Sequence, residues 1–201
     1  MSGIQPVGSQ LPWGVAISGA SGAPYAVRLL EILASHSVPT HLIVTEHGWR
    51  LLEAETGIVG EAELREATGG DWSSVEVFDN EDRGALPASG SVRSAGLVIC
   101  PCSMGTVSAV AHGSSRSLVE RAADVALKEG RKLILVPRET PLSIVHLRNL
   151  LLAAEAGATV IPASPGFYHR PQGVSDLIDF LVQRILDQMD LDIQIAPRWK
   201  G

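Results

Sequence analysis

The sequence predicts an α/β protein of one domain, with a parallel β-sheet covered by helices on both faces. Short apolar runs rich in β-branched residues alternate with longer stretches of helical periodicity, and strands that are joined through helices pair in parallel. The chain has 201 residues, of which 45% are hydrophobic and 19% are charged. This length and composition are ordinary for one globular domain with a sizeable core.

Six short apolar runs are the expected strands, and six amphipathic stretches are the expected helices. The strands are expected at residues 13–18, 41–44, 75–78, 96–100, 132–136 and 158–161. The helices are expected at residues 23–35, 48–55, 104–111, 117–129, 142–156 and 174–189. Residues 68–94 are rich in Gly, Ser, Asp and Pro, which favours a loop around one strand.

The helix after the sequence RETP has clearly marked ends. Thr140 is the expected N-cap, Pro141 the first helical residue and Gly157 the stop. Proline suits the first turn of a helix and glycine the position just after its end.

Composition excludes several classes of function. A formal net charge of −6 argues against a general nucleic-acid surface, which would need a basic stripe. Residues 1–12 contain no basic segment followed by an apolar core, and no apolar run reaches membrane-spanning length, so we expect a cytoplasmic protein. Cys100 and Cys102 are too few for a disulfide framework and lack the second ligand pair of a zinc site. We expect buried free thiols and no metal.

The turn after the first strand, SGASGAP, comes close to two sequence signatures and matches neither. It lacks the Gly-x-Gly-x-x-Gly spacing of a dinucleotide site, and it misses the Gly-x-Ser-x-Gly nucleophile elbow by its last residue, Ala23. The turn by itself therefore leaves its ligand open.

Polar residues follow the first, second, fourth and fifth expected strands, as SGASGAP, Thr45-Glu46, PCSMGT and PRETP. Ligands of open parallel sheets bind outside the carboxyl ends of the strands. Ser21, Ser103 and Thr140 lie at or just before helix starts, where a hydroxyl caps free amides and the amides attract an anion. Each serine or threonine alone is explained as an N-cap, but three at one edge favour an anion pocket.

Two pairs of charged residues extend this prediction. Arg138 and Glu139 follow directly after an apolar strand, so we expect their side chains at the same edge. Arg121 and Lys128 are seven residues apart, which places both on one side of their helix. Such a pair could clamp a phosphate. The alternative is that both side chains only border the apolar stripe of the helix.

Further polar candidates lie later in the chain and on the helix after the second strand. The loop SPGFYHRPQ brings Tyr168, His169 and Arg170 together, and Arg184 lies on the apolar stripe of the last helix. Glu55 is either a site residue or a solvated helix residue, which is the commoner fate of a glutamate.

Together, the motifs SGASGAPYAVRLL, PCSMGT, RAADVALKEGRKLILVPRETPL and PASPGFYHRPQ resemble those of the flavin prenyltransferases of the UbiX type, once described as phenylacrylic acid decarboxylase-like proteins. The resemblance covers about residues 13–190. It implies a flavodoxin-like (Rossmann-like) three-layer fold and a metal-independent enzyme that binds reduced FMN. Such an enzyme joins a dimethylallyl group, from dimethylallyl monophosphate, to N5 and C6 of the flavin. The product, prenylated FMN, serves a partner decarboxylase.

The resemblance also implies which residues contact FMN and which contact the prenyl phosphate. It implies FMN contacts for Gly19, Ala20, Ser21, Thr45, Ser103, Met104, Gly105, Thr106 and Arg138. It implies prenyl-phosphate contacts for Ser89, Arg121, Lys128, Glu139, Tyr168 and Arg184. We expect the FMN phosphate among the amides after the first strand, near Arg138.

Four residues are expected to act in the reaction. Loss of an allylic phosphate builds negative charge on the leaving group, which fixed cations and a proton donor stabilise. Lys128 is the expected cation and Glu139 the expected proton donor. Glu55 is a candidate for moving protons around the flavin, with Ser21 as a hydrogen-bonding group.

One position departs from the family. Some relatives place a flavin-facing tryptophan just before the SG loop, and this chain has Arg83 near that position. Stacking on the flavin is then weaker or comes from another residue.

Two alternatives of other classes are a flavin-dependent decarboxylase acting on a cysteine and a non-catalytic FMN carrier. The decarboxylases carry a PASANT segment, where this chain has PCSMGT. A carrier has no need of residues that bind a leaving phosphate.

We divide the chain into a flexible N-terminal lead at residues 1–12, a flavoprotein domain at 13–190 and a C-terminal tail at 191–201. The tail, LDIQIAPRWKG, is apolar with an aromatic tip, so we expect it to pack on a neighbouring subunit. The resemblance implies a homo-oligomer, a dodecamer with its sites at subunit junctions.

Overall fold

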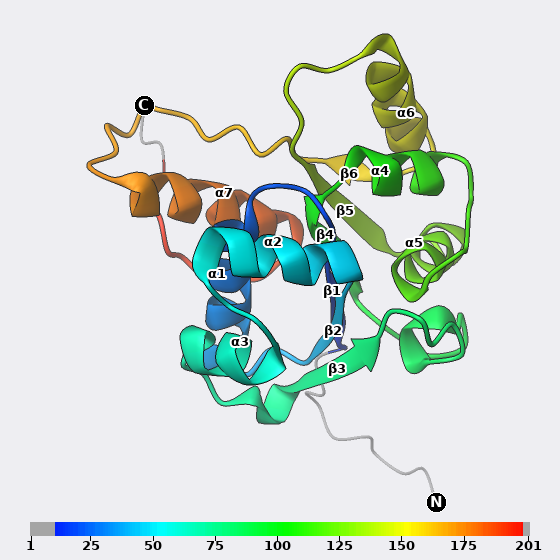
Figure 1. Cartoon of the computed structure of the whole chain (residues 1–201), viewed down its shortest axis with the longest axis horizontal. Helices are drawn as coiled ribbons and strands as arrows, with labels where there is room; N and C mark the ends of the chain where they lie inside the picture. The colour runs from blue at the N-terminus through cyan, green and yellow to red at the C-terminus, as the bar shows by residue number, and fades with distance from the viewer. Residues whose placement is uncertain (1–10, 199–201) are drawn as a thin grey trace, which may run out of the picture.

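A six-stranded parallel sheet forms the centre of the molecule. The structure is a computed structural model, and it describes residues 11–198. The strands lie in the order β3-β2-β1-β4-β5-β6 (Figure 1). They are β1 (Trp13–Ile17), β2 (Thr40–Val44), β3 (Val75–Asp79), β4 (Gly96–Cys102), β5 (Lys132–Pro137) and β6 (Thr159–Val160).

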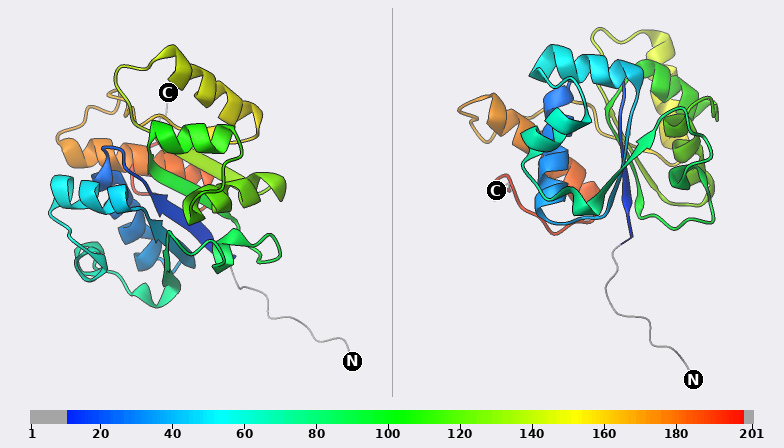
Figure 2. Two further views of the ribbon diagram at one scale, coloured as in Figure 1. Left: turned by 45° about the vertical axis from the view of Figure 1, so that its right-hand side comes forward. Right: turned by 60° about the horizontal axis from the view of Figure 1, so that its bottom comes forward.

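Helices cover both faces of this sheet, which confirms the predicted three-layer architecture. They are α1 (Ala23–Ser35), α2 (Glu46–Thr56), α3 (Glu61–Thr68), α4 (Met104–Ala111), α5 (Leu118–Lys128), α6 (Ile144–Glu155) and α7 (Val174–Gln188). Figure 2 shows the sheet nearly edge-on, with α1 and α7 on one side and α4 and α5 on the other. Each side has its own apolar core, because parallel strands are buried on both faces.

The two central strands explain where a ligand can bind. All five residues of β1 and all seven of β4 are buried, and Val15 of β1 lies opposite both Leu42 and Val98. From β1 the chain builds the sheet outward in one direction to β3, and from β4 in the other direction to β6. The reversal leaves a crevice at the carboxyl ends of β1 and β4, the standard ligand position in such sheets.

All six predicted strands exist; four differ from the predicted length by one residue, and β4 and β6 differ by two. Strand β4 continues to Cys102, and β6 is only two residues long. Helix α3 was not predicted. It has eight residues, of which only Leu64 and Thr68 are buried, so it shows little of the apolar periodicity by which a helix is detected.

The predicted start of α6 was wrong. Its N-cap is Ser143, whose hydroxyl accepts a hydrogen bond from the amide of His146 at 3.2 Å, while the imidazole accepts one from the Ser143 amide. This reciprocal pair is a capping box, and it sets the helix start after Pro141, which follows Thr140 through a cis peptide bond. The predicted stop was correct, since α6 ends just before Gly157, whose φ is +107°.

The C-terminal tail folds back on its own chain. Leu191 and Ala196 are buried, and Ile193 and Ile195 pack against the core beneath α1 and α7. The apolar residues at 191–196 are therefore covered within one chain, and the contact with a neighbouring subunit stays a prediction. Residues 1–10 and 199–201, with most of the expected N-terminal lead, lie outside the described residues.

Two further sequence predictions concern the state of the two cysteines and the absence of a membrane-spanning run. Cys100 and Cys102 are buried free thiols, as predicted, and burial raises the pKa of the Cys100 thiol to about 12. Within residues 11–198, no helix has both the length and the apolar character needed to cross a membrane.

Candidate active site

Three helices begin at one cavity outside the carboxyl ends of the strands. Each start has a hydroxyl N-cap: Thr45 for α2, Ser103 for α4 and Ser117 for α5. We call the space between them the carboxyl-edge cavity, and its volume is about 430 Å³. Its lining residues are Ser18, Gly19, Thr45, Glu46, His47, Asn80, Glu81, Ser103, Gly105, Thr106, Arg116, Ser117, Val119 and Glu120.

Helix α4 leaves the cavity a pair of free hydrogen-bond donors. The Ser103 hydroxyl accepts from the amide of Thr106 at 3.2 Å, but within residues 11–198 no group accepts from the amides of Met104 and Gly105. The first amides of a helix have no partner inside it and carry the positive end of its dipole. This end of the cavity is therefore suited to an anion.

The start of α5 differs, because its amides are already satisfied. The backbone carbonyl of Asn80 accepts from the amide of Leu118 at 2.8 Å, and its side-chain oxygen accepts from that of Val119 at 3.3 Å. Arg116, on the cavity rim, pairs with Glu120 at 2.8 Å. The anion-binding capacity of the cavity thus lies with α4 rather than α5.

Glycine is required where the first turn of α2 packs over the turn after β1. A Cβ atom on Gly19 would lie 2.5 Å from the Cβ of His47, and one on Gly48 would lie 2.4 Å from the carbonyl oxygen of Ile17. These distances are too short for any larger residue. The close approach gives the cavity its wall on the β1 side.

Glu55 reaches from α2 to the start of α1. Its carboxylate accepts from the amides of Gly22 and Ala23, both at 2.8 Å. Burial would raise the pKa of Glu55, but hydrogen bonds from Gly22, Ser21 and Ala23 and the charge of Arg138 outweigh it and lower that pKa. Glu55 is thereby held as a carboxylate.

Glu55 occupies two of the amides after β1, those of Gly22 and Ala23. The amides of Met104 and Gly105, at the start of α4, have no acceptor among the described residues. The FMN phosphate at the turn after β1 stays a prediction, and the start of α4 is a second candidate position.

Arg138 lies beside Glu55 and carries an unused donor. Its Nε is buried and has no hydrogen-bond partner among the described residues. Such a group costs free energy unless a ligand or water satisfies it. Glu139 follows it and lines a neighbouring cavity of about 130 Å³ with Arg138. Its carboxylate accepts from the amide of Thr140 at 3.1 Å.

Tyr168 and Arg184 meet at a different place, on the side of the sheet covered by α7. They line a cavity of about 280 Å³ together with Phe180 and Asp187. The rings of His169 and Phe180 are stacked with centroids 5.2 Å apart, and Tyr168 packs edge-on against Phe180 at 5.5 Å. Tyr168 and His169 of the predicted aromatic loop therefore pack against Phe180 of α7.

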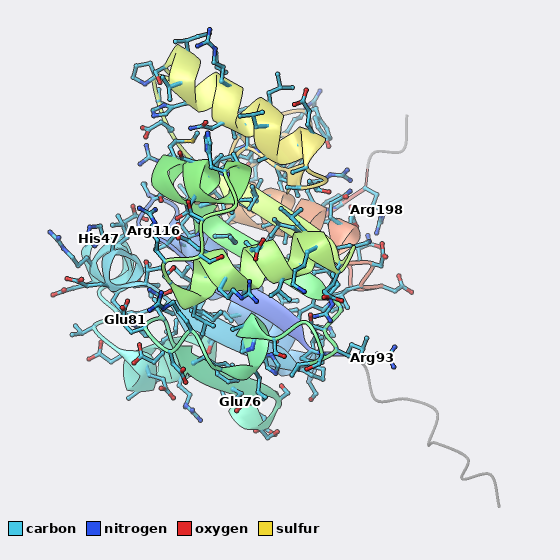
Figure 3. All side chains as sticks on the ribbon, turned by 90° about the vertical axis from the view of Figure 1, so that its right-hand side faces the viewer. His47, Glu76, Glu81, Arg93, Arg116 and Arg198 are labelled. Carbon is cyan, nitrogen blue, oxygen red and sulfur yellow. The ribbon has the colours of Figure 1, made fainter. Side chains whose placement is uncertain are left out.

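Ser89 and Lys128 lie at the amino edge of the sheet, remote from the other predicted residues. Lys128 ends α5 just before β5 begins and pairs with Glu129. The segment around Gly90 packs against it. Strand β5 separates Lys128 from Glu139, and its six residues span about 20 Å. Figure 3 shows Arg93, which follows this segment, far from His47 and Arg116 on the cavity rim.

Arg121 forms an ion pair within α5. Its guanidinium pairs with Asp124 at 2.7 Å on the same helix. This contact matches the alternative in which the side chains of Arg121 and Lys128 only border the apolar stripe of the helix. Arg83 is exposed in the turn after β3, and no described contact of Arg83 replaces the tryptophan of some relatives.

Several lining residues were not predicted from the sequence, among them His47, Asn80, Arg116 and Ser117. Ser117 was available as the expected first residue of the helix 117–129. Asn80 gave no signal, because its contact with α5 joins residues 39 positions apart.

Comparisons with known proteins agree with this arrangement. A family model described as Flavoprotein matches residues 7–186. Flavin prenyltransferase UbiX of Pseudomonas aeruginosa is 45% identical over 192 residues, which cover 92% of each chain. A probable UbiX-like flavin prenyltransferase of a Streptomyces species is 47% identical over 190 residues, covering 93% of this chain and 90% of the relative.

Solved structures give the same result. The crystal structure of AnUbiX (PadA1) in complex with FMN and dimethylallyl pyrophosphate has a TM-score of 0.89 at 39% identity, covering 96% of this chain and 99% of the other. A dodecameric FMN-dependent Ubix-like decarboxylase from Escherichia coli O157:H7 has a TM-score of 0.87 at 38% identity, covering 95% and 100%. A PPC decarboxylase, at 19% identity and a TM-score of 0.59, shares the fold alone. The fold, the carboxyl-edge cavity and the sequence identity to these relatives agree. The chain therefore belongs to the flavin prenyltransferases of the UbiX type, within the flavoprotein family.

Proposed function

We propose that this protein transfers a dimethylallyl group from dimethylallyl monophosphate to N5 and C6 of reduced FMN. The product is prenylated FMN, which a partner decarboxylase uses. The observation that carries this proposal is the carboxyl-edge cavity, with two free amides at α4 and the unpartnered Nε of Arg138 nearby. One relative is solved with FMN and dimethylallyl pyrophosphate, and both molecules suit this chemistry.

The described residues fit FMN. The amides of Met104 and Gly105, with the hydroxyls of Ser103 and Thr106, would hold its phosphate. Thr45 and the turn at Gly19 and Ala20 would line the remainder, and Arg138 Nε would donate to a polar atom of the flavin. Reduced FMN, when bound, supplies the two nucleophilic positions that are alkylated.

The two glutamates receive different roles. Glu55 is held as a carboxylate by the amides of Gly22 and Ala23 and by the Ser21 hydroxyl, so it is assigned to orient hydrogen-bond donors around the flavin rather than to protonate the leaving group. Glu139 accepts only the amide of Thr140 among the described groups and is assigned to protonate the departing phosphate. Lys128 would neutralise that phosphate, which lowers the barrier without a change in the protonation of the lysine.

These assignments require more than one copy of the chain. Glu139 and Lys128 lie at opposite edges of the sheet, and Tyr168 and Arg184 line a third location. A site containing all of them forms only where copies meet. The outer face of α6, next to Glu139, supports such contacts, because Ile144, Leu147 and Leu151 are 48–62% exposed. With a dodecameric relative, we propose a homo-dodecamer with its sites at subunit junctions.

The expected location in the cytoplasm is part of the proposal. Its support is that the two cysteines of the chain are buried free thiols, a state that reducing compartments preserve.

A mass spectrum of the flavin tests the reaction class. The protein is incubated with reduced FMN and dimethylallyl monophosphate under anaerobic conditions. The flavin is then released, and its mass is measured by mass spectrometry. An added five-carbon unit is the expected result, and the Lys128→Ala variant is the control for non-enzymatic alkylation. Unchanged FMN that co-purifies with the protein would favour the carrier. Loss of CO₂ from a peptide with a carboxyl-terminal cysteine would favour the decarboxylase.

A further inference from the structure

The cavity at Tyr168 and Arg184 contains a second arginine, which comes from the C-terminal tail. Its lining includes Asp187 and Arg198 besides Tyr168 and Arg184, and its volume is about 280 Å³. Figure 3 places Arg198 on the opposite side of the molecule from His47 and Arg116. This tail cavity is therefore separate from the carboxyl-edge cavity of the same chain.

A buried glutamine fastens the tail in place. Gln183 of α7 is 5% exposed. Its amide nitrogen donates to the carbonyl of Ile193 at 3.0 Å, and its oxygen accepts from the amides of Ile195 at 2.7 Å and Ala196 at 3.3 Å. These three contacts hold the tail backbone at residues 193–196 against α7, independently of the ion pair that Arg198 forms. Figure 1 shows the segment after α7 running back beside that helix.

One carboxylate holds two guanidinium groups side by side. Asp187 Oδ2 accepts from Arg184 at 2.9 Å, and Asp187 Oδ1 accepts from Arg198 at 3.0 Å and from the Gln183 amide at 3.0 Å. Two positive charges against one negative charge leave the tail cavity electropositive. An arginine has five N–H donors, so each keeps donors for a ligand, and both side chains are about half exposed.

We propose that Arg198 is a further ligand of the anionic group of the prenyl donor, acting beside Arg184 and Tyr168, with Asp187 as the positioning residue for both arginines. This inference rests on the proposed function, which places the donor phosphate at Tyr168 and Arg184. Paired guanidinium groups bind phosphate through several hydrogen bonds at once. The C-terminal tail is then part of the donor site.

The test measures donor binding apart from chemistry. Dimethylallyl monophosphate is titrated calorimetrically into the intact assembly loaded with oxidised FMN, so that no transfer occurs. Arg198→Ala is expected to weaken donor binding about tenfold, as for the loss of one charge-assisted hydrogen bond in a partly exposed site. Arg198→Lys keeps the positive charge but removes the planar guanidinium with its parallel N–H donors, so we expect a smaller loss of donor affinity than for Arg198→Ala. FMN affinity is expected to stay unchanged in both.

Two further variants control the result. Arg65→Ala removes an exposed arginine that also pairs with a glutamate, at 2.8 Å on α3, and is expected to bind the donor normally. Gln183→Leu releases the tail without changing any charge. It is expected to weaken donor binding in the same direction, and adding Arg198→Ala to it is expected to cause little further loss, because both changes remove Arg198 from the cavity. Gln183→Leu disturbs a buried network, so Arg198→Ala is the decisive variant if Gln183→Leu fails to fold.

The outcomes separate this inference from the proposed function. If the unaltered protein binds no donor, the proposed function fails and the inference fails with it. If the unaltered protein binds the donor and Arg198→Ala binds it equally well, only the inference is overturned. Light scattering accompanies each titration. A loss of donor binding in Arg198→Ala together with a loss of assembly would assign Arg198 to the subunit contact and overturn its role as a ligand.

Discussion

The carboxyl-edge cavity and the proposed donor-binding residues, the two halves of the candidate active site, are built in different ways. The carboxyl-edge cavity is complete within one chain: β1 and β4 place Gly19 and Ser103 at the same edge, and α4 points its free amides into the space between them. The residues that we propose for donor binding are spread over three locations of the same chain, at Glu139, at Tyr168 and Arg184, and at Lys128. In our proposal the flavin site therefore depends on the fold of one chain, and the donor site depends on the assembly.

This difference separates two kinds of variant. Changes in the carboxyl-edge cavity should affect flavin binding whatever the state of assembly. Changes in the donor-binding residues should leave flavin binding intact and affect transfer. The Glu139, Ser103 and Ser21 variants below each test one side of that division, and Glu55→Gln tests the contacts assigned at the start of α1.

The largest effect is expected from Glu139→Gln. This change keeps the shape of the side chain and removes its proton, so prenyl transfer should slow by about 10² to 10⁴-fold, the usual contribution of general acid catalysis. FMN should bind as before. Single-turnover absorbance of reduced FMN at saturating donor measures the rate, with Glu66→Gln on exposed α3 as the control. Transfer at the unaltered rate would show that the phosphate departs without the help of Glu139.

Ser103→Asp should have the next largest effect, and on flavin binding. Aspartate caps a helix as well as serine does, so α4 should persist, while a carboxylate enters the cavity beside the Met104 and Gly105 amides. Repulsion of about 4 kcal/mol between unit charges 4 Å apart at an effective dielectric constant of 20 would weaken FMN binding by about 10² to 10³-fold.

Ser21→Asp is the matched control for that experiment. Its side chain lies at the start of α1, where Glu55 already occupies the amides, so FMN affinity should fall much less. Flavin fluorescence quenching measures both variants. A larger loss for Ser21→Asp than for Ser103→Asp would return the phosphate to the turn after β1.

The smallest effect is expected from Glu55→Gln, on stability. Because the pKa of Glu55 is lowered in the folded state, its stabilising contribution is present above the ordinary carboxyl pKa and is lost as the pH falls through the folded value. The variant should therefore unfold at a lower temperature than the unaltered protein at pH 7, and this difference in unfolding temperature should shrink as the pH falls below the ordinary carboxyl pKa. Glu53→Gln on the same helix is the control. A gap that widens in acid would contradict the assigned contacts.

Local pattern was enough to predict which residues meet at the carboxyl edge of the sheet. The six strands follow from apolar β-branched runs, and Ser103 and Thr45 were found because polar residues directly after parallel strands share one edge. The start of α6 was misplaced because Pro141 resembles a first-turn proline, whereas Ser143 and His146 form the actual capping box. Helix α3 escaped detection because it buries few residues.

The donor half could not be predicted to the same depth. The spacing of Arg121 and Lys128 shows that they share a helix side, but not that the helix carries Lys128 away from Glu139 to the amino edge. The pairing of Arg198 with Asp187 depends on a tail that reverses direction after α7, and no local pattern encodes that reversal. Contacts between copies lie beyond any single chain.

Mixed assemblies test the division between the two halves most directly. Lys128→Ala and Glu139→Gln are each expected to be nearly inactive, and the two chains are co-expressed so that they assemble together, which native mass spectrometry verifies. If one copy supplies Lys128 and another supplies Glu139, random mixing leaves about one quarter of the sites with both residues intact, and transfer should return to about that fraction of the unaltered rate. Mixed assemblies as inactive as either variant alone would show that both residues act within one chain and would contradict the account.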